Sequence, residues 1–187
     1  RIWRHIIWDY QRKRVMKPLL ILDLNGTLVL SEHRPYPGVR PHSMARRKYI
    51  YFRPNLRRFL QYAFRHFRVA VWSSNSDENV AATVEQIFTP EERDALEFAW
   101  GRSHCATPAE AHGDYKSFKR VDLLCTERRE AHASVVIVDD TCDKIVLPPG
   151  AGLCLIDSFV KPHEGDKGLM DTAEWLSERF GLPHDYL

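Results

Sequence analysis

Residues 19–29 read LLILDLNGTLV, and this stretch decides the fold. It begins with Leu19–Leu22, a run of large apolar residues without polar alternation. Such a short run is typical of a strand that is buried on both faces of a parallel sheet. Asp23 follows the run directly and Gly26 favours a turn, so we predict a buried strand that ends in a polar loop.

The same pattern of short apolar strands separated by helices continues along the chain. Between Leu56 and Phe67, apolar residues recur at i, i+3, i+4 and i+7, which is the stripe of an amphipathic helix. Further helices are expected over residues 76–88, 115–130 and 168–180. Strands that alternate with helices indicate right-handed βαβ units. We predict an α/β fold, a Rossmann-like three-layer sandwich with a mainly parallel central sheet and no large cap domain. The other strands are expected at Tyr49–Phe52, Val69–Trp72, Phe98–Gly101, Ser134–Val138 and Leu153–Ile156.

The predicted domain covers residues 18–187, and a basic amphipathic helix is predicted over residues 1–17. This helix carries Trp3 and Trp8, and we favour its packing on the domain over binding to a partner or a membrane surface. The longest apolar run near the start is Leu19–Leu22, which is far too short to span a bilayer.

The net charge of +2 conceals a strong asymmetry between the two parts of the chain. Residues 1–68 contain 16 Lys and Arg but only three acids, a balance of +13, whereas residues 69–187 contain 11 Lys and Arg and 22 acids, a balance of −11. Clustered cations favour an anionic partner. The four cysteines form no C-x-x-C pair, which argues against a zinc site and favours a reducing intracellular compartment.

Polar residues follow the predicted strands at the points where these strands end. In open parallel sheets, reactive groups collect at the carboxyl ends of the strands, so these residues are expected to share a site. Each residue alone has an ordinary structural explanation, such as a turn cap or a solvated surface charge. Together, one carboxylate after the first strand, two after a later strand, a hydroxyl pair and a lysine point to one phosphoryl-transfer site. The residues are Asp23, Ser73, Ser74, Lys116, Asp139 and Asp140.

The strings DLNGT and VVIVDD, with a serine and a lysine between them, resemble the four motifs of the haloacid dehalogenase superfamily. Within it, the chain is most similar to the phosphatases of the RNA polymerase II C-terminal tail, the NLI-interacting-factor-like family. FAWGRSHC followed by GDYKSFKRVDLL is similar to the stretch that leads into that family's lysine motif. The resemblance covers about residues 17–180.

The resemblance implies a catalytic role for several residues. Asp23 would be the nucleophile that forms an aspartyl-phosphate. Ser73, with Ser74 beside it, would bind a phosphate oxygen, and Lys116 would neutralise charge on the phosphate and on Asp23. Gly26 would allow a sharp turn that directs N–H groups, including that of Thr27, toward the phosphate.

The resemblance also implies a magnesium site. Asp23, the backbone carbonyl of Asn25 and Asp139 would hold Mg²⁺, and Asp140 would support this set of ligands.

Asn25 departs from the family pattern. The family has a second aspartate here, which protonates the leaving alcohol and then activates water, and general acid–base catalysis typically contributes about 10²–10⁴-fold. Since an amide cannot transfer this proton, binding should survive better than turnover. Three explanations stay open: a native asparagine in a slow or phosphate-binding protein, a native asparagine with another proton donor, or an engineered Asp-to-Asn substrate trap.

A group of arginines is predicted at the rim of the substrate site, in the segment between Asp23 and Ser73. They favour a phosphorylated protein or another anionic partner, whereas no RNA-binding motif supports a nucleic acid. The expected activity is Mg²⁺-dependent hydrolysis of phosphoserine or phosphothreonine in proteins, slowed at Asn25, and the alternative is a silenced binding module. A nuclear or cytoplasmic location is favoured, with the mitochondrion as the alternative. The rim arginines are Arg40, Arg46, Arg47 and Arg53.

Overall fold

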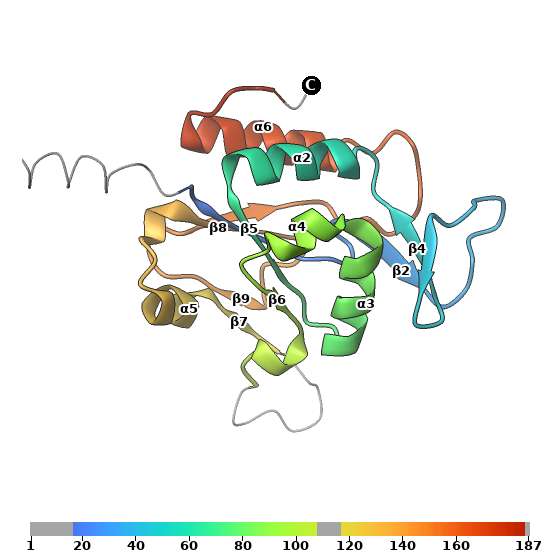
Figure 1. Ribbon diagram of the computed structural model, residues 1–187, viewed down its shortest axis with the longest axis horizontal. Helices are drawn as coiled ribbons and strands as arrows, with labels where there is room; N and C mark the ends of the chain where they lie inside the picture. Colours follow the sequence, from blue (N-terminus) through green and yellow to red (C-terminus); the bar gives the residue numbers. More distant parts are fainter. Residues whose placement is uncertain (1–16, 108–116, 186–187) are drawn as a thin grey trace, which may run out of the picture.

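A computed structural model describes residues 17–107 and 117–185 and has a five-stranded parallel sheet at its centre (Figure 1). The strand order is β10-β8-β1-β5-β6, so the run that opens the domain is the middle strand. This arrangement confirms the predicted α/β fold with a parallel central sheet. The strands are β1 (Leu19–Leu22), β5 (Arg68–Trp72), β6 (Ala99–Trp100), β8 (Val135–Asp139) and β10 (Gly152–Leu155).

Helices cover both faces of this sheet, because alternate residues of β1 enter two different cores. Leu20 and Leu22 belong to the core under three helices, and Leu19 and Ile21 to the core under a fourth. Figure 1 shows two of the first three, α2 and α6, side by side along one face. The helices of the first face are α2 (Leu56–His66), α3 (Asp77–Ile87) and α6 (Gly168–Phe180), and α5 (Val121–Arg128) covers the other.

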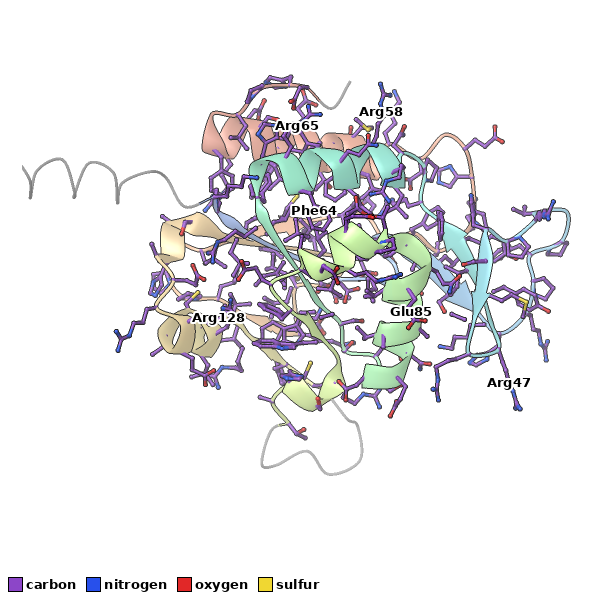
Figure 2. All side chains as sticks on the ribbon, in the orientation of Figure 1. Arg47, Arg58, Phe64, Arg65, Glu85 and Arg128 are labelled. Atoms are coloured by element: carbon purple, nitrogen blue, oxygen red, sulfur yellow. The ribbon has the colours of Figure 1, made fainter. Side chains whose placement is uncertain are left out.

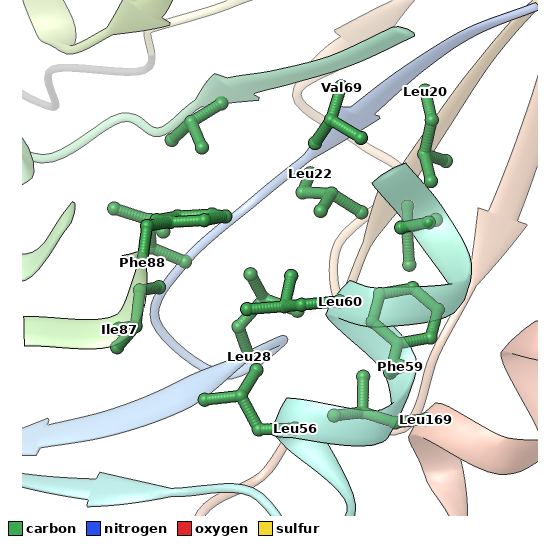
Figure 3. Close-up of a cluster of buried hydrophobic side chains, with 14 of the residues drawn as sticks. Leu20, Leu22, Leu28, Leu56, Phe59, Leu60, Val69, Ile87, Phe88 and Leu169 are labelled. Atoms are coloured by element: carbon green, nitrogen blue, oxygen red, sulfur yellow. The ribbon is translucent and has the colours of Figure 1, made fainter. Parts of the chain in front are cut away.

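The larger core is built on the apolar stripe of α2. Phe59 and Leu60 are fully buried in the same core as Leu22 and Leu28, and the close-up of Figure 3 shows Leu60 beside Leu28 and Phe59 beside Leu169. Complete burial of a leucine or phenylalanine side chain stabilises a fold by about 1.5–3 kcal/mol. The predicted i, i+3, i+4 stripe therefore anchors α2 firmly on the sheet.

The segment between β1 and α2 forms an antiparallel ribbon (residues 29–52) rather than a mostly irregular excursion. Its strands are β2 (Val29–Glu32), β3 (Ser43–Ala45) and β4 (Lys48–Phe52), in the order β2-β4-β3. Only the last of these was expected from sequence. Arg46 and Arg47 form the tip between β3 and β4 and both have positive φ angles.

The predicted helix over residues 115–130 is shorter in the structure. Lys119–Arg120 form a short strand, β7, which pairs with β9 (Ile145–Val146), and α5 begins only at Val121. Residues 108–116 lie outside the described part, as do residues 1–16 with the predicted N-terminal helix. The remaining elements are α4 (Pro90–Asp94) and two 3-10 helices, η1 (Arg102–His104) and η2 (His132–Ser134).

Among the described residues, no helix combines the length and the apolar character that crossing a bilayer requires.

Candidate active site

The carboxyl ends of three neighbouring strands bring the predicted site residues together. β1 and β8 are paired in parallel, which makes Asp23 and Asp139 neighbours, and the Asp23 N–H donates to the Val138 carbonyl at 3.0 Å. β5 lies on the other side of β1, and Ser73 follows its last residue. The backbone register of the sheet is therefore sufficient to bring these residues to one edge.

A pocket of about 310 Å³ opens at this edge of the sheet. It contains six of the predicted residues: Asp23, Asn25, Ser73, Ser74, Asp139 and Asp140. It also contains residues that the sequence analysis did not single out: Asn75, Arg102, Ser117, Lys119, Thr141 and Lys144.

Lys119 is the cation that contacts the carboxylates. Its ammonium donates to Asp23 Oδ1 at 2.7 Å and also to Asp139 Oδ2. All three residues are at most 5% exposed. Lys116, to which the resemblance assigned this role, lies outside the described residues. Lys119 lies in β7, two residues before α5 begins at Val121, and no pattern in the sequence distinguishes it from Lys116.

Burial and charge set the ionisation of this group. Burial is the main reason why the pKa of Asp23 rises to about 6, and the charges of Asp139 and Asp140 add to the rise, while Lys119 opposes it. Burial would lower the pKa of Lys119, but the attraction of the two adjacent carboxylates outweighs it and raises that pKa. Lys119 is therefore a fixed positive charge beside Asp23.

The carboxylates fit a hard divalent cation. Oxygen atoms of Asp23, Asp139 and Asp140 lie within 4.8 Å of one another. Lys119 pairs with Asp23 and Asp139, whereas no described ion pair joins Asp140 to a cation. Carboxylate oxygens are the donors that Mg²⁺ prefers. The donor set therefore agrees with the magnesium site implied by the resemblance.

Neighbouring hydroxyl groups hold two of these carboxylates in place. Asp139 Oδ1 accepts from both the backbone N–H and the hydroxyl of Thr141, each at 2.9 Å. Asp140 Oδ2 accepts from the Ser158 hydroxyl at 2.6 Å. This second layer limits the rotation of the acids toward and away from the pocket.

Gly26 makes the predicted turn after β1, with a φ of +85°. Its N–H donates to the Val29 carbonyl at 2.8 Å, and the Thr27 N–H points to the Leu24 carbonyl, so the turn itself uses both groups. Neither residue lines the described pocket, and Thr27 is fully buried. The Thr27 N–H, which was predicted to face the phosphate, is directed at a carbonyl within the turn itself.

Ser73 and Asn25 both line the described pocket around Asp23, Ser73 directly after β5 and Asn25 in the loop after β1. Ser73 is 3% exposed, and its oxygen accepts a long hydrogen bond of 3.4 Å from the Asn75 N–H, which leaves its own proton to donate. The Asn25 carboxamide oxygen accepts from the Ser31 N–H at 2.8 Å. This contact directs the amide N–H₂ of Asn25, a donor only, away from β2.

The four rim arginines fall into two groups. Arg40, Arg46 and Arg47 are exposed on the ribbon and do not line the described pocket around Asp23. Arg53 is only 2% exposed and makes two hydrogen bonds to Asp166, of 2.7 and 3.0 Å. The prediction that Arg53 lies at an open rim is wrong, because its guanidinium is enclosed beneath the loop that ends at α6.

Comparisons with known proteins agree with this geometry. An uncharacterised FCP1 homology domain-containing protein of Schizosaccharomyces pombe is 29% identical over 163 residues, which cover 79% of this chain and 64% of that relative. This chain thus spans less than two thirds of that relative's length.

A solved structure of low sequence identity has a similar fold. Fcp1, an essential RNA polymerase II CTD phosphatase, is 16% identical, with a TM-score of 0.50 over 96% of this chain and 55% of its own. Fission yeast Fcp1 bound to beryllium fluoride is 16% identical, with a TM-score of 0.49 over 96% of this chain and 56% of its own.

The family match covers nearly the whole chain. Residues 18–184 match the family described as NIF, NLI interacting factor-like phosphatase. They include the central sheet and every described residue of the pocket around Asp23. The chain therefore belongs to the NLI interacting factor-like phosphatases of the haloacid dehalogenase superfamily.

Proposed function

We propose that this protein is a Mg²⁺-dependent phosphatase of phosphorylated proteins that acts through Asp23 and that is slow because position 25 is an asparagine. The observation that carries the proposal is the buried Asp23 carboxylate, with the Lys119 ammonium at 2.7 Å, at the closed end of a pocket that also contains Ser73. A carboxylate next to a fixed cation and hydroxyl donors is the arrangement that phosphoryl transfer requires.

In the first step, an Asp23 oxygen attacks phosphorus, the ester P–O bond breaks, and the leaving alkoxide takes up a proton. Lys119 and the Ser73 hydroxyl offset the charge on the phosphate oxygens. In the second step, water attacks the aspartyl-phosphate, releases inorganic phosphate and regenerates Asp23. Bound Mg²⁺, held by Asp23, Asp139 and Asp140, would supply further charge neutralisation at the phosphate.

Asn25 sets the speed of both steps. It lines the pocket where the proton donor of this family would lie, and it has no proton to transfer at neutral pH. Solvent must then protonate the leaving group and activate the water. Asn25→Asp is therefore expected to raise kcat by about 10²-fold or more.

The test is release of phosphate from an aryl phosphate and from phosphoserine peptides, with Mg²⁺ or with a chelator. Asp23→Asn should abolish turnover, and Asn25→Asp should increase it only when Mg²⁺ is present. Asn75→Asp serves as the matched control, because Asn75 is another amide that lines the pocket. This change should not produce the increase in rate that is expected for Asn25→Asp. Turnover that survives Asp23→Asn would refute the proposal.

A second function, a binding module with a silenced site, is favoured by the Asn25 contact with Ser31. The hydrogen bond to the Ser31 N–H uses the Asn25 carbonyl oxygen in a structural role. If neither the unaltered protein nor Asn25→Asp turns over, while both bind a phosphoserine peptide, this function replaces hydrolysis.

A further inference from the structure

A second hollow, of about 840 Å³, lies between residues 38–42 of the ribbon, the start of α2 and residues 159–164. It shares no lining residue with the described pocket around Asp23. We call it the α2 groove. Nothing in the proposed hydrolysis uses it.

The α2 groove combines an apolar floor with a basic rim. Val39, which is 39% exposed, lies among the floor residues together with Phe52 and Pro162. Arg40 and Arg58 are exposed on the rim. A surface of this kind binds a ligand that has both apolar side chains and negative charge.

Arg40 and Arg58, the two exposed arginines on the rim of the α2 groove, have no acidic partner in the described parts of the chain. Arg57 pairs with Glu92 and Arg53 with Asp166, whereas no ion pair joins Arg40 or Arg58 to a described carboxylate. The local sequence explains this, because residues 33–76 contain ten Lys and Arg and neither Asp nor Glu. Glu164 is the one acid among the described lining residues, so the groove keeps a positive balance.

The start of α2 strengthens this positive field. Its first turn contains no acidic residue, and the Asn55 side chain does not cap it. Helix N-termini normally carry acids, because the helix dipole is positive there. Here Arg58 adds positive charge to the positive end of the dipole, whereas Arg57 is paired with Glu92. An anionic ligand in the groove would offset the charge of Arg58 and of the dipole.

We propose that the α2 groove docks an acidic peptide segment of a partner protein, with apolar side chains on the floor and carboxylates on Arg40 and Arg58. The floor favours a peptide over a nucleic acid. Of the two phenylalanines that line the groove, Phe52 is stacked against His42 with the ring centroids 4.7 Å apart, and Phe159 is only 2% exposed. Single-stranded nucleic acids require open aromatic faces on which bases stack, whereas leucine and phenylalanine side chains fill an apolar floor. Docking goes beyond hydrolysis and does not depend on it.

The test is fluorescence anisotropy with the labelled peptide EDLEDFDE and the full chain, at low and at high salt. The peptide should bind, and more weakly at high salt. Replacing its leucine and phenylalanine with serine should weaken binding, and replacing its acids with lysine should abolish it. Arg40→Glu with Arg58→Glu removes two attractions and adds two repulsions, which should weaken binding about tenfold.

The matched control is Arg46→Glu with Arg47→Glu, which changes the net charge by the same amount. These residues lie at the ribbon tip, and Figure 2 shows Arg47 at the lower right of the view and Arg58 at the top. The control should leave Kd within about twofold. An equal loss in both double variants would reveal general electrostatic attraction and overturn the proposal. So would the absence of peptide binding, or tighter binding of a single-stranded oligonucleotide than of the peptide. All variants should retain the circular dichroism melting curve of the unaltered protein, since each residue is exposed.

Discussion

At the residue scale, Gly26 shows how closely the turn after β1 is fitted to the acids. Its φ is +85°, and a Cβ atom added to it would lie 2.2 Å from Asp140 Oδ2. Gly26→Ala should therefore destabilise the fold by about 2 kcal/mol or more and displace Asp140.

Gly38→Ala is the matched control for this prediction. Gly38 also has a positive φ, of +74°, but its Cβ would meet no atom within 4 Å. This change should cost only about 1 kcal/mol, from the backbone conformation. Urea unfolding of both variants measures the difference, and equal losses would contradict a role for contact with Asp140.

Lys119 stabilises two buried carboxylates at once. Removing one partner of a buried ion pair costs about 3–5 kcal/mol, because the other charge is left without compensation. Lys119→Met should therefore lower the free energy of unfolding by about this amount in the presence of a chelator. The double variant Lys119→Met with Asp23→Asn should lose less than the sum of the two single changes. Additive losses in urea titrations would show that Lys119 and Asp23 are not coupled in this way.

At the element scale, Arg53 joins three segments that are distant in the sequence. Its guanidinium donates to the Gly26 and Thr27 carbonyls at 3.3 and 3.2 Å and to the Asp157 carbonyl at 2.8 Å. Its ion pair with Asp166 holds the loop before α6. The turn that follows Asp23 is therefore held in place by Arg53, directly after β4, and by this loop.

The Arg53–Asp166 pair makes stability depend on pH. Burial opposes ionisation of Asp166, but hydrogen bonds from Arg53 and from the Gly168 N–H outweigh it, so the pKa of Asp166 lies below its ordinary value of 3.8. A carboxyl with a lowered pKa in the folded state stabilises the fold above the unfolded value, and this contribution disappears as pH falls through the folded value. Asp166→Asn should cost about 3 kcal/mol at pH 7.

This cost should stay constant from pH 7 to about pH 5 and shrink below about pH 4, as the unaltered protein loses the same interaction. Urea midpoints at each pH measure it. Asp171→Asn, an exposed acid in the first turn of α6, is the control and should cost less than about 1 kcal/mol. A cost for Asp166→Asn that persists unchanged at pH 3 would contradict the assignment.

Periodicity in the sequence predicted the elements whose contacts are dense and local. It failed to predict elements that form only through contact with a partner from elsewhere in the chain. The apolar pattern of Leu19–Leu22 and the apolar stripe of α2 are each sufficient to predict that these segments are buried. β7 depends on pairing with β9, and two residues are too few to show a period. For the same reason Lys119 could not be distinguished from Lys116 by pattern alone. Arg53 looked exposed because Asp166, its partner, lies 113 residues away.

At the scale of the whole molecule, the charge asymmetry of the chain has a defined place in the fold. The basic part contributes β1, the ribbon and α2, and the acidic part contributes Asp139 and Asp140. The sheet brings these acids next to Asp23, so residues from the basic part and from the acidic part of the chain meet in one pocket. The composition alone predicted an anionic partner. The register of β1 and β8 places Asp139 and Asp140 next to Asp23.

Because the carboxylates meet only in the folded chain, Mg²⁺ should stabilise the entire domain. A ligand that binds the folded state alone contributes RT ln(1 + [L]/Kd), about 1.4 kcal/mol at ten times Kd. For a chain of this length, that raises Tm by about 3–6 °C relative to a sample with chelator. Asp139→Asn should abolish the increase, whereas Asp143→Asn, an exposed acid outside the described pocket, should preserve it. Calorimetry distinguishes these outcomes. An increase that survives Asp139→Asn, or that disappears in Asp143→Asn, would place the ion elsewhere, because only the set formed by Asp23, Asp139 and Asp140 brings three carboxylates within reach of one cation in the described chain.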